Sequence, residues 1–264
     1  MTDSSRAALA LSALILGALA AAPAALAADA APPLPSLIPG WSGKGEVGYV
    51  DSTGNVNASN ADAKLDLAHI SGPWKEALHL EGLYSKSASA VSGERWAGLF
   101  QSNYQVTVPM FVFGAVHYTD DKFSGFAYQG SVAVGAGYNF LTSSTDKLSA
   151  QVGVGYRSLR PETLVKNTAG NVIFRVKGTT SDNAIATAEV DYEHDFNAST
   201  KLTDKLLTES GSDDTLLQND LAVQVQMSRR LALSAGYSIH DNSSPPMGVK
   251  KLDTITTLNV VFQL

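Results

Sequence analysis

The sequence predicts an all-β fold, an antiparallel up-and-down transmembrane β-barrel of about 12 strands that spans residues 41–264. Apolar and polar residues alternate with a period of two through almost all of this region, and the alternating runs reach about ten to fifteen residues. Globular strands usually have about five or six residues, whereas a tilted strand that crosses a bilayer needs about nine to eleven. In addition, Trp and Tyr recur near the ends of the runs, on the apolar side, as in the two aromatic girdles of a membrane barrel.

The first predicted strand, residues 41–50, shows this pattern clearly. Trp41, Val47 and Tyr49 alternate with Lys44 and Glu46, so one face is apolar and the other is charged. The same alternation predicts strands in further ranges, among them 61–70, 77–84, 95–105, 148–157, 188–193 and 221–228.

The weakest alternation lies in residues 199–209, where Leu202, Leu206 and Leu207 would also suit a helix. Between the strands, short and long connections are expected to take turns, as in outer-membrane barrels. Short ones are predicted around Gly72-Pro73, Val108-Pro109, Asn197-Ala198 and Arg229-Arg230, and longer ones at 86–93, 160–180 and 241–251.

The N-terminal region predicts export. Residues 7–28 are almost wholly apolar, follow Arg6 and contain the small-residue sequence Ala25-Leu26-Ala27. We therefore expect a cleavable secretory signal peptide over residues 1–27 and an Ala/Pro-rich leader over 28–40. The alternative is an uncleaved membrane anchor, because the apolar run is long enough to cross a bilayer.

Many charged residues lie on the polar face of the predicted strands, and in a closed barrel this face would point into the lumen. These residues are Lys44, Glu46, Asp62, Lys64, Asp66, His79, Glu81, Arg95, Arg157, Glu189, Asp191, Glu193 and Asp253. A charge is costly in a dry interior unless it is paired, so this pattern predicts water or mutual ion pairs inside. Two interpretations are consistent with this pattern: a narrow polar pore that favours cations, and an interior plugged by salt bridges. The pore is the preferred interpretation.

The last residues predict the strand that closes the barrel. Leu258, Val260, Phe262 and Leu264 alternate with less apolar neighbours and are expected to face lipid. Closure would pair this strand with the one at Trp41, because an open sheet edge is not stable in lipid. The same four residues form a predicted assembly signal for the barrel-assembly machinery. Barrels that this tail resembles usually end in Phe, whereas here Leu264 is last.

Three longer segments resemble a known family. They are NYQVTVPMFVFGAVHYTDDKFSGFAYQGSVAVGAGYNFL, QVGVGYRSL and YSIHDNSSPPMGVKKLDTITTLNVVF. Together they resemble the YdiY-like family of salt-induced outer-membrane proteins, a domain-of-unknown-function family of the DUF481 type. The likeness covers roughly residues 41–264. It implies an outer-membrane barrel and an association with salt or osmotic stress, but no agreed activity.

Motifs for catalysis and cofactors are sparse. The Gly-x-Gly pairs at 135–137 and 153–155 lack the third glycine and the helix of a dinucleotide loop, so packing between strands is expected instead. Ser238 and His240 share one strand face and form the best candidate for a barrel hydrolase of lipid or peptide. His117 with Asp120 and Asp121 could bind a metal, but these residues suit an ordinary solvated turn.

We therefore expect a non-enzymatic barrel in the outer membrane of a Gram-negative bacterium, a narrow polar pore or a structural envelope protein linked to salt stress. Its expected partners are outer-membrane lipid, the barrel-assembly machinery and small ions or solutes. No cofactor or metal is expected, and the net charge of -6 without a basic cluster predicts no nucleic-acid partner. The alternatives are the barrel enzyme with a site near Ser238/His240 and a soluble periplasmic β-sandwich binding protein.

Overall fold

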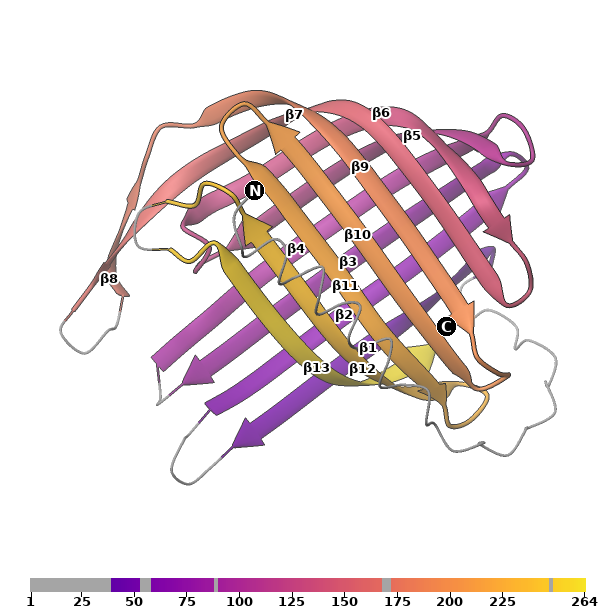
Figure 1. Ribbon diagram of the computed structural model, residues 1–264. Helices are drawn as coiled ribbons and strands as arrows, with labels where there is room; N and C mark the ends of the chain where they lie inside the picture. Colours follow the sequence, from indigo (N-terminus) through magenta and orange to yellow (C-terminus); the bar gives the residue numbers. More distant parts are fainter. Residues whose placement is uncertain (1–38, 53–57, 88–89, 168–171, 247–248) are drawn as a thin grey trace.

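A computed structural model of the protein describes residues 39–52, 58–87, 90–167, 172–246 and 249–264. In these residues the chain forms a sheet of β-strands that closes on itself (Figure 1). The strands are β1 (Trp41–Ser52), β2 (Ala58–Ser71), β3 (Trp74–Ser87), β4 (Ala90–Gln105), β5 (Met110–Asp121), β6 (Phe126–Thr142), β7 (Asp146–Lys166), β8 (Val172–Lys177), β9 (Ser181–Asp195), β10 (Thr200–Gly211), β11 (Thr215–Gln226), β12 (Leu231–Asn242) and β13 (Leu252–Gln263). The described residues include no helix long and apolar enough to cross a membrane.

Twelve of these strands make a closed antiparallel ring. Strands β1 to β7 pair in sequence order, β7 then pairs with β9, and the order continues to β13, which pairs with β1. In the described part of the chain, strand β8 pairs with the far end of β7 alone, at Glu162–Lys166. The predicted barrel of about twelve strands is confirmed, and a two-sheet sandwich is excluded because the two edges of the sheet are joined.

The connections gather at the two ends of the barrel. The turn end carries 72–73, 106–109, 143–145, 196–199 and 227–230, and the opposite end, the loop end, carries the remaining connections. The prediction that short connections alternate with long ones is only partly right. At the loop end, 243–251 is long, but β3 and β4 continue until only 88–89 separate them. Small residues in the segment 85–93 make its apolar and polar alternation weak, so the sequence did not predict that the two strands extend this far.

The long connection predicted at 160–180 is wrong, because β7 continues to Lys166 and returns as β8. The resulting hairpin extends beyond the ring (Figure 1). Pro161 suggested a break in the strand, since proline cannot donate a ladder hydrogen bond. In the structure it lies opposite Phe126, beside a shift in the register between β6 and β7, where a regular ladder is already interrupted.

Residues 200–211, with the weak pattern, form a strand and not a helix. The two neighbouring leucines separate by parity. Leu207 lines a cavity inside the barrel, and Leu206 lies on the opposite face with part of its side chain exposed. This arrangement follows from the period-two geometry, which no helix would give.

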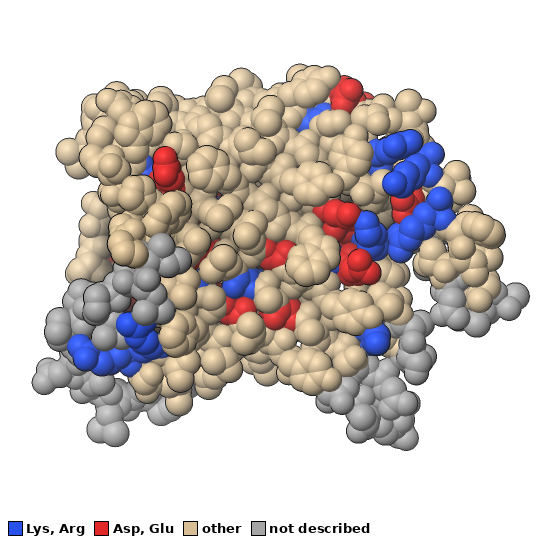
Figure 2. Space-filling view, turned by 180° about the vertical axis from the view of Figure 1, so that it is seen from behind, with Lys and Arg blue, Asp and Glu red and all other residues tan. Residues whose placement is uncertain are grey.

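Burial in this barrel is the reverse of that in a water-soluble protein. Val47, Val154 and Leu258 on the outer face are 61%, 66% and 63% exposed, whereas Arg157 and Glu189 inside are 1% and 5% exposed. Figure 2 shows a lateral face covered mostly by uncharged atoms, with charged atoms in separate groups. An apolar exterior around a polar interior is the arrangement expected of a barrel whose outer wall contacts lipid.

Glycines on β6 and β7 make room for two phenyl rings inside the barrel. Phe111 and Phe113 are buried, and a Cβ atom on Gly137 would overlap the ring of Phe111. A Cβ atom on Gly135 would lie 2.7 Å from the ring of Phe113. The Gly-x-Gly pairs therefore ease packing between strands, as expected, and lie within strands instead of a nucleotide-binding turn.

We predict that Gly137→Ala destabilises the barrel by about 1–3 kcal/mol, because the added methyl group displaces the buried ring of Phe111. Urea unfolding of the detergent-folded protein, followed by tryptophan fluorescence, measures the loss. Gly114→Ala on β5 is the matched control, since a Cβ atom there meets nothing within 4 Å. Equal effects of the two substitutions would contradict the packing role of Gly137.

Candidate functional site

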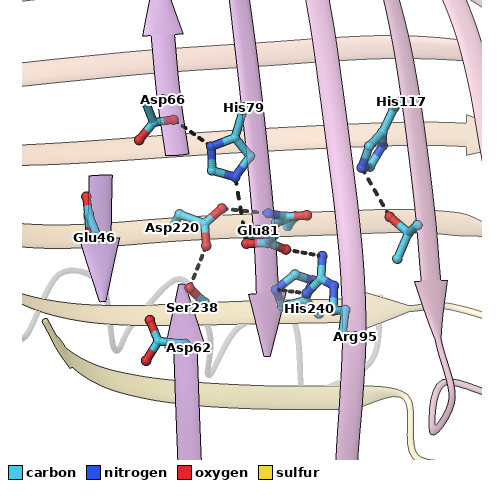
Figure 3. A network of polar contacts seen from close by, with 12 residues as sticks. Glu46, Asp62, Asp66, His79, Glu81, Arg95, His117, Asp220, Ser238 and His240 are labelled. Atoms are coloured by element: carbon cyan, nitrogen blue, oxygen red, sulfur yellow. Dashed lines mark hydrogen bonds and ion pairs between the residues drawn. The ribbon is translucent and has the colours of Figure 1, made fainter. Parts of the chain in front are cut away.

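The candidate site is the polar interior of the barrel, where the inward charges form three groups. The first is a chain of contacts from β1 across β2, β3 and β4 to β12, here called the His79 chain (Figure 3). The second surrounds the buried Arg157, and the third follows the acidic residues of β9. Each group joins strands that are neighbours in the ring, and two of them also bridge the lumen.

The His79 chain begins at the ion pair of Lys44 with Glu46, 2.6 Å long, and passes to Asp66, 3.8 Å from the same lysine. His79 Nδ1 lies 2.6 Å from Asp66 Oδ1, and His79 Nε2 lies 3.7 Å from Glu81. The register of the strands explains this series, because Lys44 faces Asp66 and Asp66 faces His79 on neighbouring strands. Opposite charges on one face of a sheet thus stabilise each other across the ladder.

The far end of the His79 chain crosses the lumen. Arg95 Nη2 lies 3.0 Å from Glu81 Oε1, and Arg95 Nη1 lies 2.9 Å from His240 Nε2 on β12. Because a guanidinium only donates, the histidine nitrogen must accept this hydrogen bond. The contact links two strands that lie far apart in both the sequence and the ring.

A second group, the Arg157 cluster, consists of Arg157, Asp214, Glu209, Ser131 and His117. The guanidinium of Arg157 forms a hydrogen bond and ion pair with the carboxylate of Asp214 and lies 3.7 Å from Glu209. Ser131 donates to Glu209 at 2.8 Å, and His117 lies 3.9 Å from the same carboxylate. Asp214 belongs to the connection between β10 and β11, so this cluster ties that connection to the barrel wall.

The third group is the acidic stripe, Glu189, Asp191, Glu193 and Asp195 on β9. Lysines of the neighbouring strands pair with it: Lys205 lies 3.2 Å from Glu189, and Lys147 lies 2.6 Å from Glu193. Asp191 receives only a contact of 4.0 Å from Lys205. The stripe therefore has fewer close cationic partners than carboxylates.

The remaining predicted interior residues lie outside these groups. Asp62 accepts a hydrogen bond of 2.8 Å from Asn259. This bond passes over Gly48 of the strand between them, where a Cβ atom would overlap both side chains. Lys64 lines a cavity, and Asp253 lies opposite His240 near the loop end.

The predicted closing strand is β13, which pairs antiparallel with β1. Leu258, Val260 and Phe262 are exposed on the outer face, and the N–H of Leu264 donates to the carbonyl of Gly43 at 2.9 Å. This pairing ties the apolar terminal strand into the sheet. The reading of these residues by an assembly machinery stays a prediction.

Several residues face the interior although the sequence pattern did not predict it. Lys205 and Glu209 belong to β10, where the weak alternation did not reveal which residues face inward. Gln101 and Gln151 exchange amide hydrogen bonds of 3.0 and 3.1 Å across the lumen. Both side chains are uncharged, so the pattern of inward charges did not include them. The alternation of side chains along each complete strand predicts that these residues face inward, but it does not predict which residues they contact.

The catalytic alternative at Ser238 and His240 lacks the required contact. The hydroxyl of Ser238 donates to Asp220 at 2.5 Å, and the ring of His240 accepts from Arg95 (Figure 3). A serine nucleophile needs a base within hydrogen-bond reach, and here the histidine nitrogens are engaged by a cation. Both side chains also line an interior cavity and do not face the outer wall.

The three candidate metal ligands His117, Asp120 and Asp121 each contact different partners. His117 contacts Thr119 and Glu209, Asp120 pairs with Lys122, and Asp121 accepts from backbone N–H groups of the following turn. Within the described residues, no group of three or more His, Asp or Glu side chains could hold a metal ion.

Two cavities of about 30 Å³ each lie between the groups. The first is lined mainly by the far end of the His79 chain with Lys64 and Ser238, and the second by residues of the Arg157 cluster with Gln101 and Gln151. A water molecule needs roughly 10–15 Å³ of such space and two to four polar partners. Each cavity therefore has room for about two water molecules beside charged side chains.

We predict that Arg157→Met destabilises the barrel by about 3–5 kcal/mol, because it leaves the buried carboxylates of Asp214 and Glu209 without their cation. Lys147→Met is the control, since that lysine is 59% exposed and its loss should cost about 1 kcal/mol or less. Urea unfolding in the same detergent compares the two variants. A loss for Arg157→Met no larger than that for Lys147→Met would refute a stabilising Arg157 cluster.

The protein resembles known proteins in sequence and in structure. The protein is similar to the uncharacterized protein YdiY of Escherichia coli (strain K12), with 22% identity over 230 residues that cover 85% of this chain and 83% of that protein. Among solved structures it is similar to the NanC porin, with a TM-score of 0.47 and 12% identity over 85% of this chain and 100% of that one. It is also similar to the translocator domain of the autotransporter NalP from Neisseria meningitidis, with a TM-score of 0.46 and 13% identity over 85% and 87% of the two chains.

A family description also matches most of the chain. Residues 45–264 match the family described as "Protein of unknown function, DUF481", and this range includes nearly all of the barrel from β1 to β13. The resemblance inferred from the sequence is thereby confirmed, and the chain belongs to the DUF481 family.

Proposed function

We propose that the protein is an outer-membrane β-barrel that conducts small cations through a narrow polar lumen and performs no catalysis. The observation that carries the proposal is the charged interior, where the acidic stripe has fewer close cationic partners than carboxylates. A water-filled path lined by surplus carboxylates attracts cations and repels anions.

The membrane location is supported by the reversed burial. Exposed valines and leucines on the outer face, aromatic residues at strand ends and a charged interior together suit a bilayer and not water. Closed antiparallel barrels with an even number of strands are typical of bacterial outer membranes, and we place this protein in the outer membrane of a Gram-negative bacterium. A link to salt or osmotic stress, implied by the family resemblance, is part of the same proposal.

The proposed lumen is narrow because of the strand number and the side chains inside. Barrels of eight strands are filled by side chains, and those of about sixteen enclose an aqueous channel. A ring of twelve lies between these limits. Phe111, Phe113 and the Arg157 cluster occupy part of the interior, so the proposal concerns small ions and not larger solutes.

The main alternative is a sealed barrel with a structural role in the envelope. It is favoured by the Arg157 cluster, whose buried ion pairs and hydrogen bonds join β5, β6, β7 and β10. If all interior charges stay paired in this way, the same residues close the lumen.

We predict that the purified protein gives a small, cation-favouring conductance in planar bilayers, and that combined Glu189→Gln, Asp191→Asn and Glu193→Gln substitutions reduce the cation preference. The reversal potential in a salt gradient should move toward zero, because the carboxylates that exclude anions are gone. Asp182→Asn is the control, because Asp182 is exposed and lies on the outward face of the same strand.

Two results would count against this proposal. An unchanged reversal potential in the triple variant would remove the acidic stripe as the selectivity element. A silent bilayer in which insertion has been verified would favour the sealed structural barrel.

A further inference from the structure

The seam between β1 and β13, where the barrel closes, is paired along only part of its length. Pairing runs from Lys44 opposite Gln263 to Gly48 opposite Asn259 and stops there, whereas each of the other strand pairs in the ring is aligned at ten or more positions. Among the residues that the structure describes, residues 49–52 of β1 pair with β2 alone, and residues 252–258 of β13 pair with β12 alone. In Figure 1 the indigo β1 and the yellow β13 diverge toward the loop end.

Two unpaired strand edges are unusual in a barrel wall that faces lipid. Each backbone N–H or C=O group left without a partner in hydrocarbon costs several kcal/mol, which is why membrane barrels normally close completely. The unpaired half of the seam therefore marks a place where the lumen and the surrounding bilayer are not separated by a continuous ladder.

A polar cavity lies behind this half of the seam. It is lined by Ile255 and Thr257 of the unpaired part of β13 and by residues of β2, β3, β4 and β12. The polar members are Asp62, Lys64, Glu81, Arg95, Ser238 and His240, and Leu83 adds apolar surface. A molecule that passes between β1 and β13 would thus meet an apolar outer surface first and charged groups next.

The unpartnered groups in this cavity are donors. The Nε atom of Arg95 is buried and makes no hydrogen bond, although the side chain is about nine-tenths buried. Within the described residues Lys64 has no ion pair within 4.0 Å, although Asp62 and Glu81 are close enough to interact with its charge. In contrast, Lys44, Arg95 and Lys205 each have a carboxylate partner. The acidic neighbours of Lys64 are already engaged, because Glu81 pairs with Arg95 and Asp62 accepts from Asn259. Two donors without a close acceptor, one of them on a lysine, suit an anionic group.

The outer part of the path suits a hydrocarbon chain. Tyr49 and Leu258, the first residues beyond the paired half on each strand, are both exposed on the outer face. The cavity, with a volume of about 30 Å³, has room for a small head group. The site therefore combines a compact pocket for an anionic group with an apolar approach from the side of the barrel.

We propose that the loop half of the β1–β13 seam is a lateral entrance for a single-chain amphiphile with a carboxylate head. The head group binds Lys64 and the Nε atom of Arg95, and the hydrocarbon chain lies between β1 and β13 toward the bilayer. This inference rests on the membrane location in the proposed function but not on ion conduction.

The first test measures binding of radiolabelled dodecanoate to the protein in lipid nanodiscs, with dodecanol as the uncharged probe. Lys64→Met should weaken dodecanoate binding at least tenfold and leave dodecanol binding unchanged. The control is Lys205→Met, because that lysine is held by Glu189 on another part of the wall. Equal binding of dodecanoate by the Lys64→Met variant and the unmodified protein would overturn the head-group site.

The second test closes the entrance with a disulfide. The sequence contains no cysteine, so within one molecule a Tyr49→Cys/Leu258→Cys variant can form only the bridge that extends the paired half of the seam. Oxidation should abolish dodecanoate binding, and reduction should restore it. The control variant, Val47→Cys/Val260→Cys, joins two residues that already face each other and should bind dodecanoate in both states.

The outcomes separate this inference from ion conduction. Binding with unmodified affinity after the Tyr49–Leu258 bridge has formed would overturn the lateral entrance. Absence of dodecanoate binding by the unmodified protein would overturn the amphiphile site, even if the bilayer conductance is as proposed. Binding without conductance would support the site and reject the conduit.

Discussion

The pairing of backbone N–H and C=O groups around a ring is the constraint on which the rest of this structure depends. In a bilayer no water can satisfy these groups, so the sheet must return to its own first strand. Once β13 pairs with β1, the alternation of side chains along every strand fixes one face toward the outside and one toward the lumen. The exposed valines and the buried arginine and glutamates follow from that single geometric condition.

Closure creates a second problem, which the interior solves with ion pairs. Charged side chains that face a confined lumen lose much of their hydration and need partners. Neighbouring strands supply them through register, as in the contact of Asp66 with His79, and opposite walls supply them across the lumen, as in the contact of Arg95 with His240. The small residues are part of the same solution, because Gly48 leaves the space in which Asn259 reaches Asp62.

The period of two was sufficient to predict the fold, the approximate strand number and the parity of residues such as Lys44, Glu189 and Val260. It failed where the pattern was obscured, at the hairpin of β7 and β8 behind Pro161 and at the small residues around 88–89. It could not predict the contacts across the lumen. The bond of Ser131 to Glu209 joins residues 78 positions apart, and it depends on the curvature of the ring, which no local pattern encodes. The length of the pairing between β1 and β13 depends in the same way on the closed shape.

The ion pair of Arg157 with Asp214 also limits how the loop end can vary. Surface connections in barrels usually tolerate insertions, because their backbone lies outside the packed wall. The connection between β10 and β11 differs, since Asp214 is buried and anchors it to β7 from inside. Added residues there would draw the carboxylate away from its arginine. During divergence of this family, new length is therefore expected to collect in the connections without such an anchor and to spare residues 212–214.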